Sequence, residues 1–250
     1  MLLYLITLNL RFLTVTSSQM EPKVVGGNIS KILNHPYSAF LVVAQNTSAF
    51  ICGASIVNQK LLLTAAHCFD TVARKTKVTA NIGHANKRKG YVVKILNIKI
   101  HPKYNTMRIT TDIALIGLAE EIQFGAVINR VALARRRPRA GVALIAGWGL
   151  LSVSLYNKKN RGGRYPPMEN YNLNINYFIF RGDSGSPLMV NGYLQIGLVS
   201  FKKIHLSRSV IVYTDIAYYY KWITENARNV VKLRDVVFIA SDSTRLWRPF

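Results

Sequence analysis

Short apolar segments alternate with polar, turn-rich segments along most of the chain. In the first half, apolar segments lie at residues 39–43, 56–57, 61–63, 78–82, 91–100 and 113–118. A second series lies at residues 142–146, 171–180, 188–190, 194–201 and 210–213. Short strands at regular spacing, separated by turn residues, are typical of antiparallel barrels and sandwiches. The pattern therefore predicts an all-β fold built in two halves.

One segment near the C-terminus departs from this strand pattern. Residues 217–233 have helical periodicity. The face of this helix that packs against the β-structure is expected to carry Tyr218, Trp222 and Ile223. Residues 230–250 are predicted to form a C-terminal extension, to which we assign no role.

The N-terminal residues have the character of a targeting segment. Residues 1–18 are mostly apolar and end in small polar residues, as a secretory signal peptide does. Arg11 interrupts the apolar run, and the run is too short to predict a membrane anchor.

The composition indicates a folded and strongly basic protein. Half of the 250 residues are apolar, and 33 Lys and Arg face 11 Asp and Glu, for a net charge of +22. Such a charge attracts polyanions. However, no nucleic-acid motif or row of interleaved aromatic residues accompanies the basic clusters at residues 87–89 and 135–139. We therefore expect a solvated basic surface, weak polyanion binding at most, and no specific nucleic-acid partner.

Three separated motifs carry the candidate chemistry. His67 ends the apolar run LTAAHC, Asp112 opens the apolar segment TDIALI, and Ser184 lies between two glycines in GDSGSP. Each motif alone has an ordinary structural interpretation. Together and in this order they are far more specific, because a serine nucleophile needs a neighbouring base and that base needs an orienting carboxylate.

With their flanking residues, these motifs resemble those of the chymotrypsin/trypsin family of serine proteases. The resemblance runs from about residue 24 to about residue 225 and includes VVGG at 24–27, CGASI at 52–56, HPKY at 101–104 and GWG at 147–149. It implies two antiparallel, six-stranded-type β-barrels packed together with a C-terminal helix, and here the second barrel is incomplete. His67 and Asp112 would come from the first barrel and Ser184 from the second.

The resemblance also divides the chain into functional segments. The expected order is a signal peptide (1–18), an activation propeptide (19–23), a protease domain (24–229, with barrels at 24–125 and 126–229) and the extension (230–250).

The family's activation mechanism would operate at the start of the protease domain. Cleavage after Lys23 would free the amino group of Val24, which would fold inward and pair with Asp183. This pair would shape the loop at Gly182, so that the backbone N–H groups of Gly182 and Ser184 form the oxyanion hole. The resemblance thus implies a zymogen.

The chain has two cysteines, Cys52 and Cys68. The residues alone leave open whether the two thiols stay reduced. The resemblance pairs them in a disulfide that ties the histidine loop to its strand, which implies an oxidising compartment and secretion.

The spacing of the triad departs from the family pattern in one place. His67 and Asp112 are 45 residues apart, close to the reference separation of about 45. Asp112 and Ser184 are only 72 residues apart (184 minus 112), where the reference separation is about 93. The missing residues fall between Trp148 and Ser184, where the family has one wall of its primary specificity pocket.

The remaining pocket positions are altered as well. Phe178 occupies the position of the pocket floor. After Ser200 and Phe201 the family has a glycine, and here the residue is Lys202. Ile211 replaces a glycine of the pocket wall. These larger side chains predict a narrowed or shallow pocket.

An intact triad beside an altered pocket leaves several interpretations open. The first, which we favour, is an active secreted endopeptidase. The others are a catalytically weak or inactive homologue that acts by binding, an incomplete gene model in which residues 177–180 are a splicing artefact, and a basic protein that acts mainly by binding anionic glycans.

The expected partners follow from the same resemblance. They are a protein or peptide substrate, protease inhibitors and weakly bound polyanions, with no membrane, and the protein is expected to be a monomer. No cofactor or metal is expected, since residues 75–89, where family members can bind calcium, contain no Asp or Glu.

Overall fold

The computed structural model of the chain describes residues 28–44, 49–70, 77–138, 142–148, 169–172, 182–205 and 208–231. Several sequence predictions lie outside the described residues: the signal peptide, the propeptide, Val24, Phe178 and residues 232–250.

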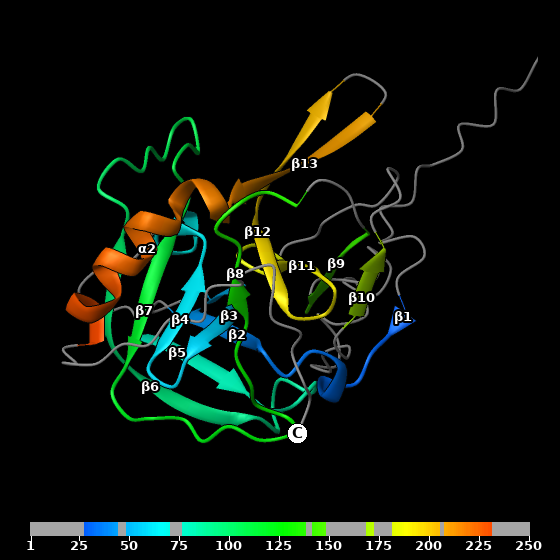
Figure 1. The fold of residues 1–250 in the computed structure, drawn as a ribbon, viewed down its shortest axis with the longest axis vertical. Helices are drawn as coiled ribbons and strands as arrows, with labels where there is room; N and C mark the ends of the chain where they lie inside the picture. The colour runs from blue at the N-terminus through cyan, green and yellow to red at the C-terminus, as the bar shows by residue number, and fades with distance from the viewer. Residues whose placement is uncertain are drawn as a thin grey trace, which may run out of the picture.

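The first half of the chain forms a closed antiparallel barrel (Figure 1). Around the barrel the strands run in the order β2 (Ser38–Ala44), β3 (Ala49–Asn58), β4 (Leu61–Thr64), β7 (Ala114–Leu118), β6 (Tyr91–Ile100) and β5 (Lys77–Ile82). Large aliphatic side chains fill its interior, among them the fully buried Leu41, Ile56, Leu63 and Ile116. All six strands overlap the apolar segments of the first series, so this part of the prediction is confirmed.

The second half, together with the N-terminal strand β1, forms a sheet that is open within the described residues. Its order is β1 (Asn28–Ile29), β10 (Glu169–Asn172), β9 (Ala143–Gly147), β11 (Pro187–Val190), β12 (Leu194–His205) and β13 (Arg208–Asp215). A short strand, β8 (Ala132–Leu133), pairs in parallel with β12. The predicted all-β architecture with two halves and a closing helix is therefore confirmed.

Strands β12 and β13 extend further than the apolar pattern predicts. Their pairing continues from Lys202 opposite Ile211 to His205 opposite Arg208. The resulting hairpin projects from the body of the molecule in Figure 1. Polar residues interrupt the apolar pattern here, but backbone hydrogen bonds pair the two strands whether or not their side chains are buried.

The closing helix α2 (Ile216–Val231) packs on β7, β6 and β4 of the barrel. The Asp215 carboxylate accepts a hydrogen bond from the backbone N–H of Ala217 at 2.9 Å, which caps the first turn. The buried face carries Ile223, Ala227 and Val230, which follow the helical repeat. The prediction for Tyr218 was wrong: its side chain is 75% exposed, because it lies on the opposite face.

Lys87 is a second correction, because it does not belong to the solvated basic surface. Its side chain is buried, its Nζ donates to the carbonyl oxygen of Trp148 at 2.9 Å, and it lies 4.8 Å from the ring centroid of Phe40. A lysine can extend its aliphatic stem along apolar surface while its ammonium finds a polar partner. In this way the barrel loop that carries Lys87 is tied to the end of β9.

Within the described part of the chain, no helix is both long and apolar enough to span a membrane.

His35 is buried at the entrance to β2. Its Nδ1 lies 3.0 Å from the Tyr37 hydroxyl and its Nε2 lies 3.0 Å from the Ser30 hydroxyl. Burial lowers the pKa of His35 from 6.5 to about 4. The imidazole is therefore neutral in the folded protein at neutral pH.

This buried histidine predicts an acid-sensitive fold. Between pH 6.5 and 4 the unfolded chain binds a proton at His35 that the folded chain does not. The free energy of unfolding should therefore fall by roughly 3 kcal/mol as the pH is lowered through this window. Below pH 4, His35 should cause no further change in the free energy of unfolding. Urea denaturation of the native protein and of His35→Gln at several pH values measures this difference. If His35→Gln showed the same dependence on pH as the native protein, the prediction would be contradicted.

Candidate active site

Strand pairing in the barrel brings the first two predicted catalytic residues together. His67 lies in the short 3-10 turn η2 (Ala66–Phe69), just after β4, and Asp112 lies just before β7. Because β4 and β7 are antiparallel, with Thr64 opposite Ala114, the end of one strand meets the start of the other. Residues 45 positions apart in the sequence therefore become neighbours.

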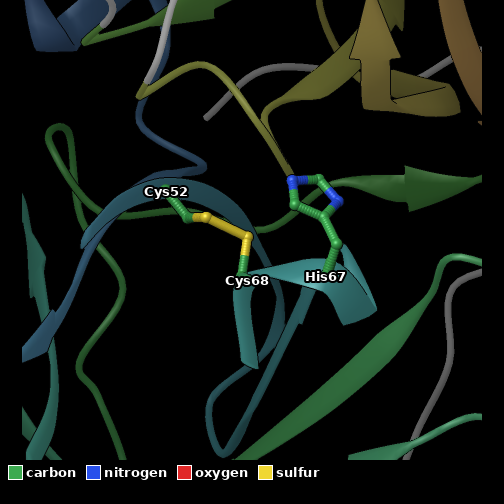
Figure 2. Close-up of side chains that lie close together, drawn as sticks. All are labelled: Cys52, His67 and Cys68. Carbon is green, nitrogen blue, oxygen red and sulfur yellow. A yellow bond between two sulfur atoms is a disulfide. The ribbon is translucent and has the colours of Figure 1, made fainter. Parts of the chain in front are cut away.

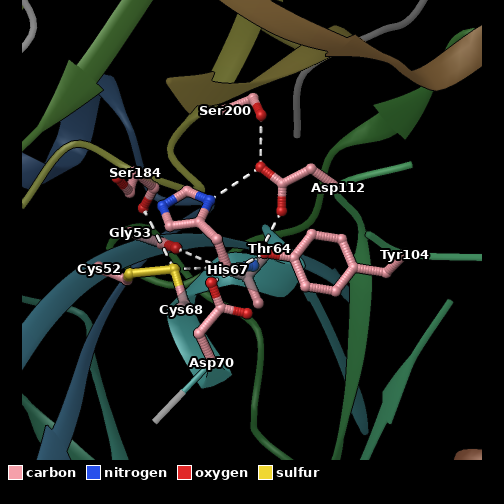
Figure 3. Close-up of a disulfide and its surroundings, with 10 residues drawn as sticks. All are labelled: Cys52, Gly53, Thr64, His67, Cys68, Asp70, Tyr104, Asp112, Ser184 and Ser200. Carbon is pink, nitrogen blue, oxygen red and sulfur yellow. Dashed lines mark hydrogen bonds and ion pairs between the residues drawn. A yellow bond between two sulfur atoms is a disulfide. The ribbon is translucent and has the colours of Figure 1, made fainter. Parts of the chain in front are cut away.

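The contact between His67 and Asp112 has the geometry of an oriented base. The His67 Nδ1 lies 2.8 Å from Asp112 Oδ2, and the His67 backbone N–H donates to Asp112 Oδ1 at 2.9 Å. An ionised carboxylate can only accept, so Nδ1 carries the proton and Nε2 remains an acceptor. Figure 3 shows Ser184 beside the imidazole ring. The structure therefore brings all three predicted triad residues to one place.

Two residues of the second sheet support Asp112. Ser200 donates its hydroxyl to Asp112 Oδ2, as Figure 3 shows, and Thr214 donates to the Asp112 carbonyl oxygen at 2.8 Å. Ser200 is the extra residue of a β-bulge, because Val199 pairs with Tyr213 while Phe201 pairs with the next residue, Val212. A bulge changes the direction in which a side chain points. Here the bulged residue is Ser200, whose hydroxyl points at the carboxylate of Asp112, a residue that is only 2% exposed.

Ser200 was predicted to line the substrate pocket, and Thr214 was not predicted to belong to the site. In the structure both side chains act on Asp112. A signal for Thr214 was present in the sequence, because the threonine directly follows the apolar residues of a predicted strand. That signal showed neither the bulge nor which carbonyl oxygen the hydroxyl would meet.

Ser184 is held in a tight loop by backbone contacts to both halves of the molecule. Its carbonyl oxygen accepts from the Gly53 N–H of β3 at 2.7 Å. The next residue, Gly185, donates to the Val199 carbonyl of β12 at 2.8 Å. Gly182 and Gly185 have φ values of 114° and 79°, a region that favours glycine. The loop thus needs its glycines, while the oxyanion-hole role of the Gly182 and Ser184 N–H groups stays a prediction.

The predicted disulfide between Cys52 and Cys68 is confirmed. It joins β3 to η2 directly beside His67, as Figure 2 shows. The two sulfurs and a ring nitrogen of His67 lie within 4.8 Å of one another, which is close enough to hold a metal ion. However, both sulfurs are bonded to each other, so neither is available as a thiolate ligand.

The predicted pocket residues are only partly described. Phe201 and Ile211 are half-buried, and the backbones of Lys202 and Ile211 lie opposite each other at the base of the β12–β13 hairpin. Phe178 and the Lys202 side chain lie outside the described residues. The narrowing of the pocket therefore stays a prediction.

Asp183, the predicted partner of the Val24 ammonium, is fully buried. Its carbonyl oxygen accepts from the Ser186 N–H at 2.9 Å, which closes a turn around Ser184 and Gly185. The pairing with Val24 stays a prediction, because Val24 lies outside the described residues.

Near His67, Tyr104 donates its hydroxyl to Asp70 Oδ2 at 2.9 Å. Desolvation, with the hydrogen bond to Asp70 and the charge of that carboxylate, raises the pKa of Tyr104. The phenol is therefore a neutral donor at physiological pH.

The Ser184 loop predicts an unequal response to alanine at two glycines of similar backbone conformation. A Cβ on Gly185 would lie 2.2 Å from Thr64 Oγ1 and 2.4 Å from the Gly53 carbonyl oxygen, whereas Gly192, with φ of 76°, has no atom within 4 Å of that position. Gly192→Ala should lower the free energy of unfolding by about 1–2 kcal/mol, the cost of a positive φ for a residue with a Cβ. Gly185→Ala should cost clearly more and should displace Ser184. Thermal denaturation of both variants tests this, and equal losses of stability would contradict it.

Comparison with known proteins gives one consistent result. The family model described as Trypsin matches residues 24–223. Similar proteins include hypodermin-B of Hypoderma lineatum, 28% identical with 84% of this chain and 90% of the relative covered, and trypsin epsilon of Drosophila erecta, 30% identical with 85% and 90% covered. The fold is similar to that of a solved scabies mite inactivated protease paralogue, S-D1, with a TM-score of 0.68 and 19% identity over 82% of this chain and 98% of that one.

Proposed function

Because the chain belongs to the trypsin family of serine proteases, we propose that it is a secreted serine endopeptidase that hydrolyses peptide bonds through an acyl-enzyme. The observation that carries this proposal is the partly buried hydrogen bond between His67 Nδ1 and Asp112 Oδ2, with Ser184 beside the same ring. Ser200 and Thr214 support this arrangement, and such support fixes the geometry on which catalysis depends.

The proposed reaction follows from the proton positions of the site. His67 Nε2 takes the proton from the Ser184 hydroxyl as Ser184 Oγ bonds to the scissile carbonyl carbon. The imidazolium then gives this proton to the leaving amine, and the peptide C–N bond breaks. Water repeats the sequence on the acyl-enzyme and releases Ser184. Asp112 remains ionised throughout, holding the tautomer of His67 and stabilising its cation.

The oxyanion of each tetrahedral intermediate would be bound by the backbone N–H groups of Gly182 and Ser184. Donors of this kind contribute roughly 3–4 kcal/mol each to transition-state stabilisation in comparable sites. Any residue other than glycine at position 182 would be strained, because φ is positive there. The glycine is therefore consistent with an N–H group that must face the reacting carbonyl closely.

Activation would couple the N-terminus to this loop. We propose cleavage after Lys23 by a protease that cuts after basic residues, followed by pairing of the Val24 ammonium with Asp183. The full burial of Asp183 supports this, because a buried carboxylate requires a close partner to offset its desolvation.

The substrate is a protein or peptide, and protein protease inhibitors are expected partners. The disulfide between Cys52 and Cys68 supports secretion, because such bonds persist in oxidising compartments.

One alternative is favoured by a specific observation. The β12–β13 hairpin pairs Lys202 with Ile211 where the family has glycines that receive substrate, and the chain is short between Trp148 and Ser184. A protein of this kind would act by binding and would cleave poorly or not at all.

The two functions are separated by covalent labelling of Ser184 with a fluorophosphonate. We expect labelling after cleavage at Lys23, and much less before it, because the probe needs an activated serine and a formed oxyanion hole but little of the pocket. Ser184→Ala is the matched control and should not be labelled. A folded, cleaved protein that the probe does not label would overturn the endopeptidase proposal in favour of the binding function.

A further inference from the structure

Ser186 is the residue after Gly185, and its hydroxyl occupies an unusual position. The side chain is fully buried, and Ser186 Oγ has no hydrogen-bond partner within the described part of the chain. A Cβ on Gly53 would lie 2.1 Å from this oxygen, and a Cβ on Gly147 would lie 3.0 Å from it. The hydroxyl therefore fits between the barrel and the second sheet only because both facing residues are glycines.

The Asp183 carboxylate shares this space. The same Cβ position on Gly147 lies 2.4 Å from Asp183 Oδ1. Asp183 and Ser186 are also the two ends of one turn, joined by the hydrogen bond from the Ser186 N–H to the Asp183 carbonyl. Ser186 Oγ and Asp183 Oδ1 thus border the same small space beside Gly147, and a single water can bridge two oxygens placed in this way.

A second buried hydroxyl, that of Tyr213, lies within the electrostatic influence of the same carboxylate. Tyr213 Oη is buried and has no hydrogen-bond partner among the described residues. Burial, and then the negative charge of Asp183, raise the pKa of Tyr213. The phenol is thus a protonated, neutral donor near a buried anion.

We propose that Ser186 is a positioning residue: its hydroxyl, assisted by that of Tyr213, stabilises the inward position of the Asp183 carboxylate independently of the N-terminal ammonium. The inference rests on the proposed function, since it concerns the activation of the same site. A burial cost that falls on a carboxylate is reduced by each donor that reaches it.

The consequence is a difference between the two forms of the protein. In this proposal the loop that carries Asp183 has two positions, an inward one that is active and an outward one that is inactive. In the cleaved form the ammonium holds nearly all molecules inward, so loss of a hydroxyl changes the active population little. In the uncleaved form the inward population is small, and it falls in proportion to any lost stabilisation. Ser186 therefore sets the residual activity of the zymogen.

The test compares fluorophosphonate labelling rates of an uncleavable full-length form, Lys23→Gln, with those of the cleaved form. Ser186→Ala should lower the rate of the uncleaved form roughly tenfold or more, the effect of a hydrogen bond to a charged group, and change the cleaved form less than about twofold. Tyr213→Phe should act in the same direction. Ser38→Ala is the matched control, because Ser38 Oγ is likewise buried without a partner among the described residues but lies in β2.

Hydrogen exchange of the 182–199 segment gives a second measurement that does not need catalysis. The Gly185 and Ser186 N–H groups are bonded within this region, so their protection reports the inward loop. Faster exchange in uncleaved Ser186→Ala than in Ser38→Ala supports the proposal, even in a protein that the probe does not label. Equal exchange, or a ratio of cleaved to uncleaved labelling that Ser186→Ala leaves unchanged, overturns it. Absence of labelling in every form, by contrast, counts against the endopeptidase function.

Discussion

The buried carboxylate of Asp112 is the constraint on which the arrangement of the two halves depends. It accepts hydrogen bonds from the backbone and the ring of His67, which belongs to the barrel, and from Ser200, which belongs to the second sheet. Thr214 of the second sheet holds the carbonyl oxygen of the same residue. An ionised carboxylate without partners would be very costly in this environment. The charge therefore favours only those arrangements in which the barrel and the sheet meet correctly.

Asp183 is the second buried carboxylate of the site, and its surroundings differ in kind. The Asp112 carboxylate accepts hydrogen bonds from the backbone and ring of His67 and from Ser200. These bonds suit a group that is proposed to hold one orientation through the reaction. Around Asp183 lie two buried hydroxyls, those of Ser186 and Tyr213, whose hydrogen bonds are incomplete within the described residues. An unpaired polar group in a low-dielectric interior is costly, so a rearrangement that gives these hydroxyls a partner is favoured. This fits the proposal that the Asp183 loop changes position on activation.

The parts that the sequence predicted are those encoded by local pattern. Alternating apolar segments defined all six barrel strands, and the motifs around His67, Asp112 and Ser184 defined the catalytic candidates, because each depends on residues adjacent in the chain. The errors concern side chains whose surroundings the local pattern does not give. Lys87 reaches the carbonyl oxygen of Trp148 in a distant segment, and Tyr218 was assigned to the wrong face of its helix. The role of Ser200 depends on a register shift between two strands, which no local pattern announces.

The position of that register shift explains how a complete triad can coexist with an altered substrate surface. Ser200 of β12 donates to Asp112, and the extended hairpin begins only two residues later, where Lys202 pairs with Ile211. The bulge anchors β12 to the Asp112 carboxylate, so sequence changes in the hairpin beyond it leave the donor to Asp112 in place. The Ser184 loop is held in a similar way, because its backbone is bonded to Gly53 and Val199. Under the proposed function, catalytic geometry and substrate preference would therefore be carried by neighbouring parts of the same strands.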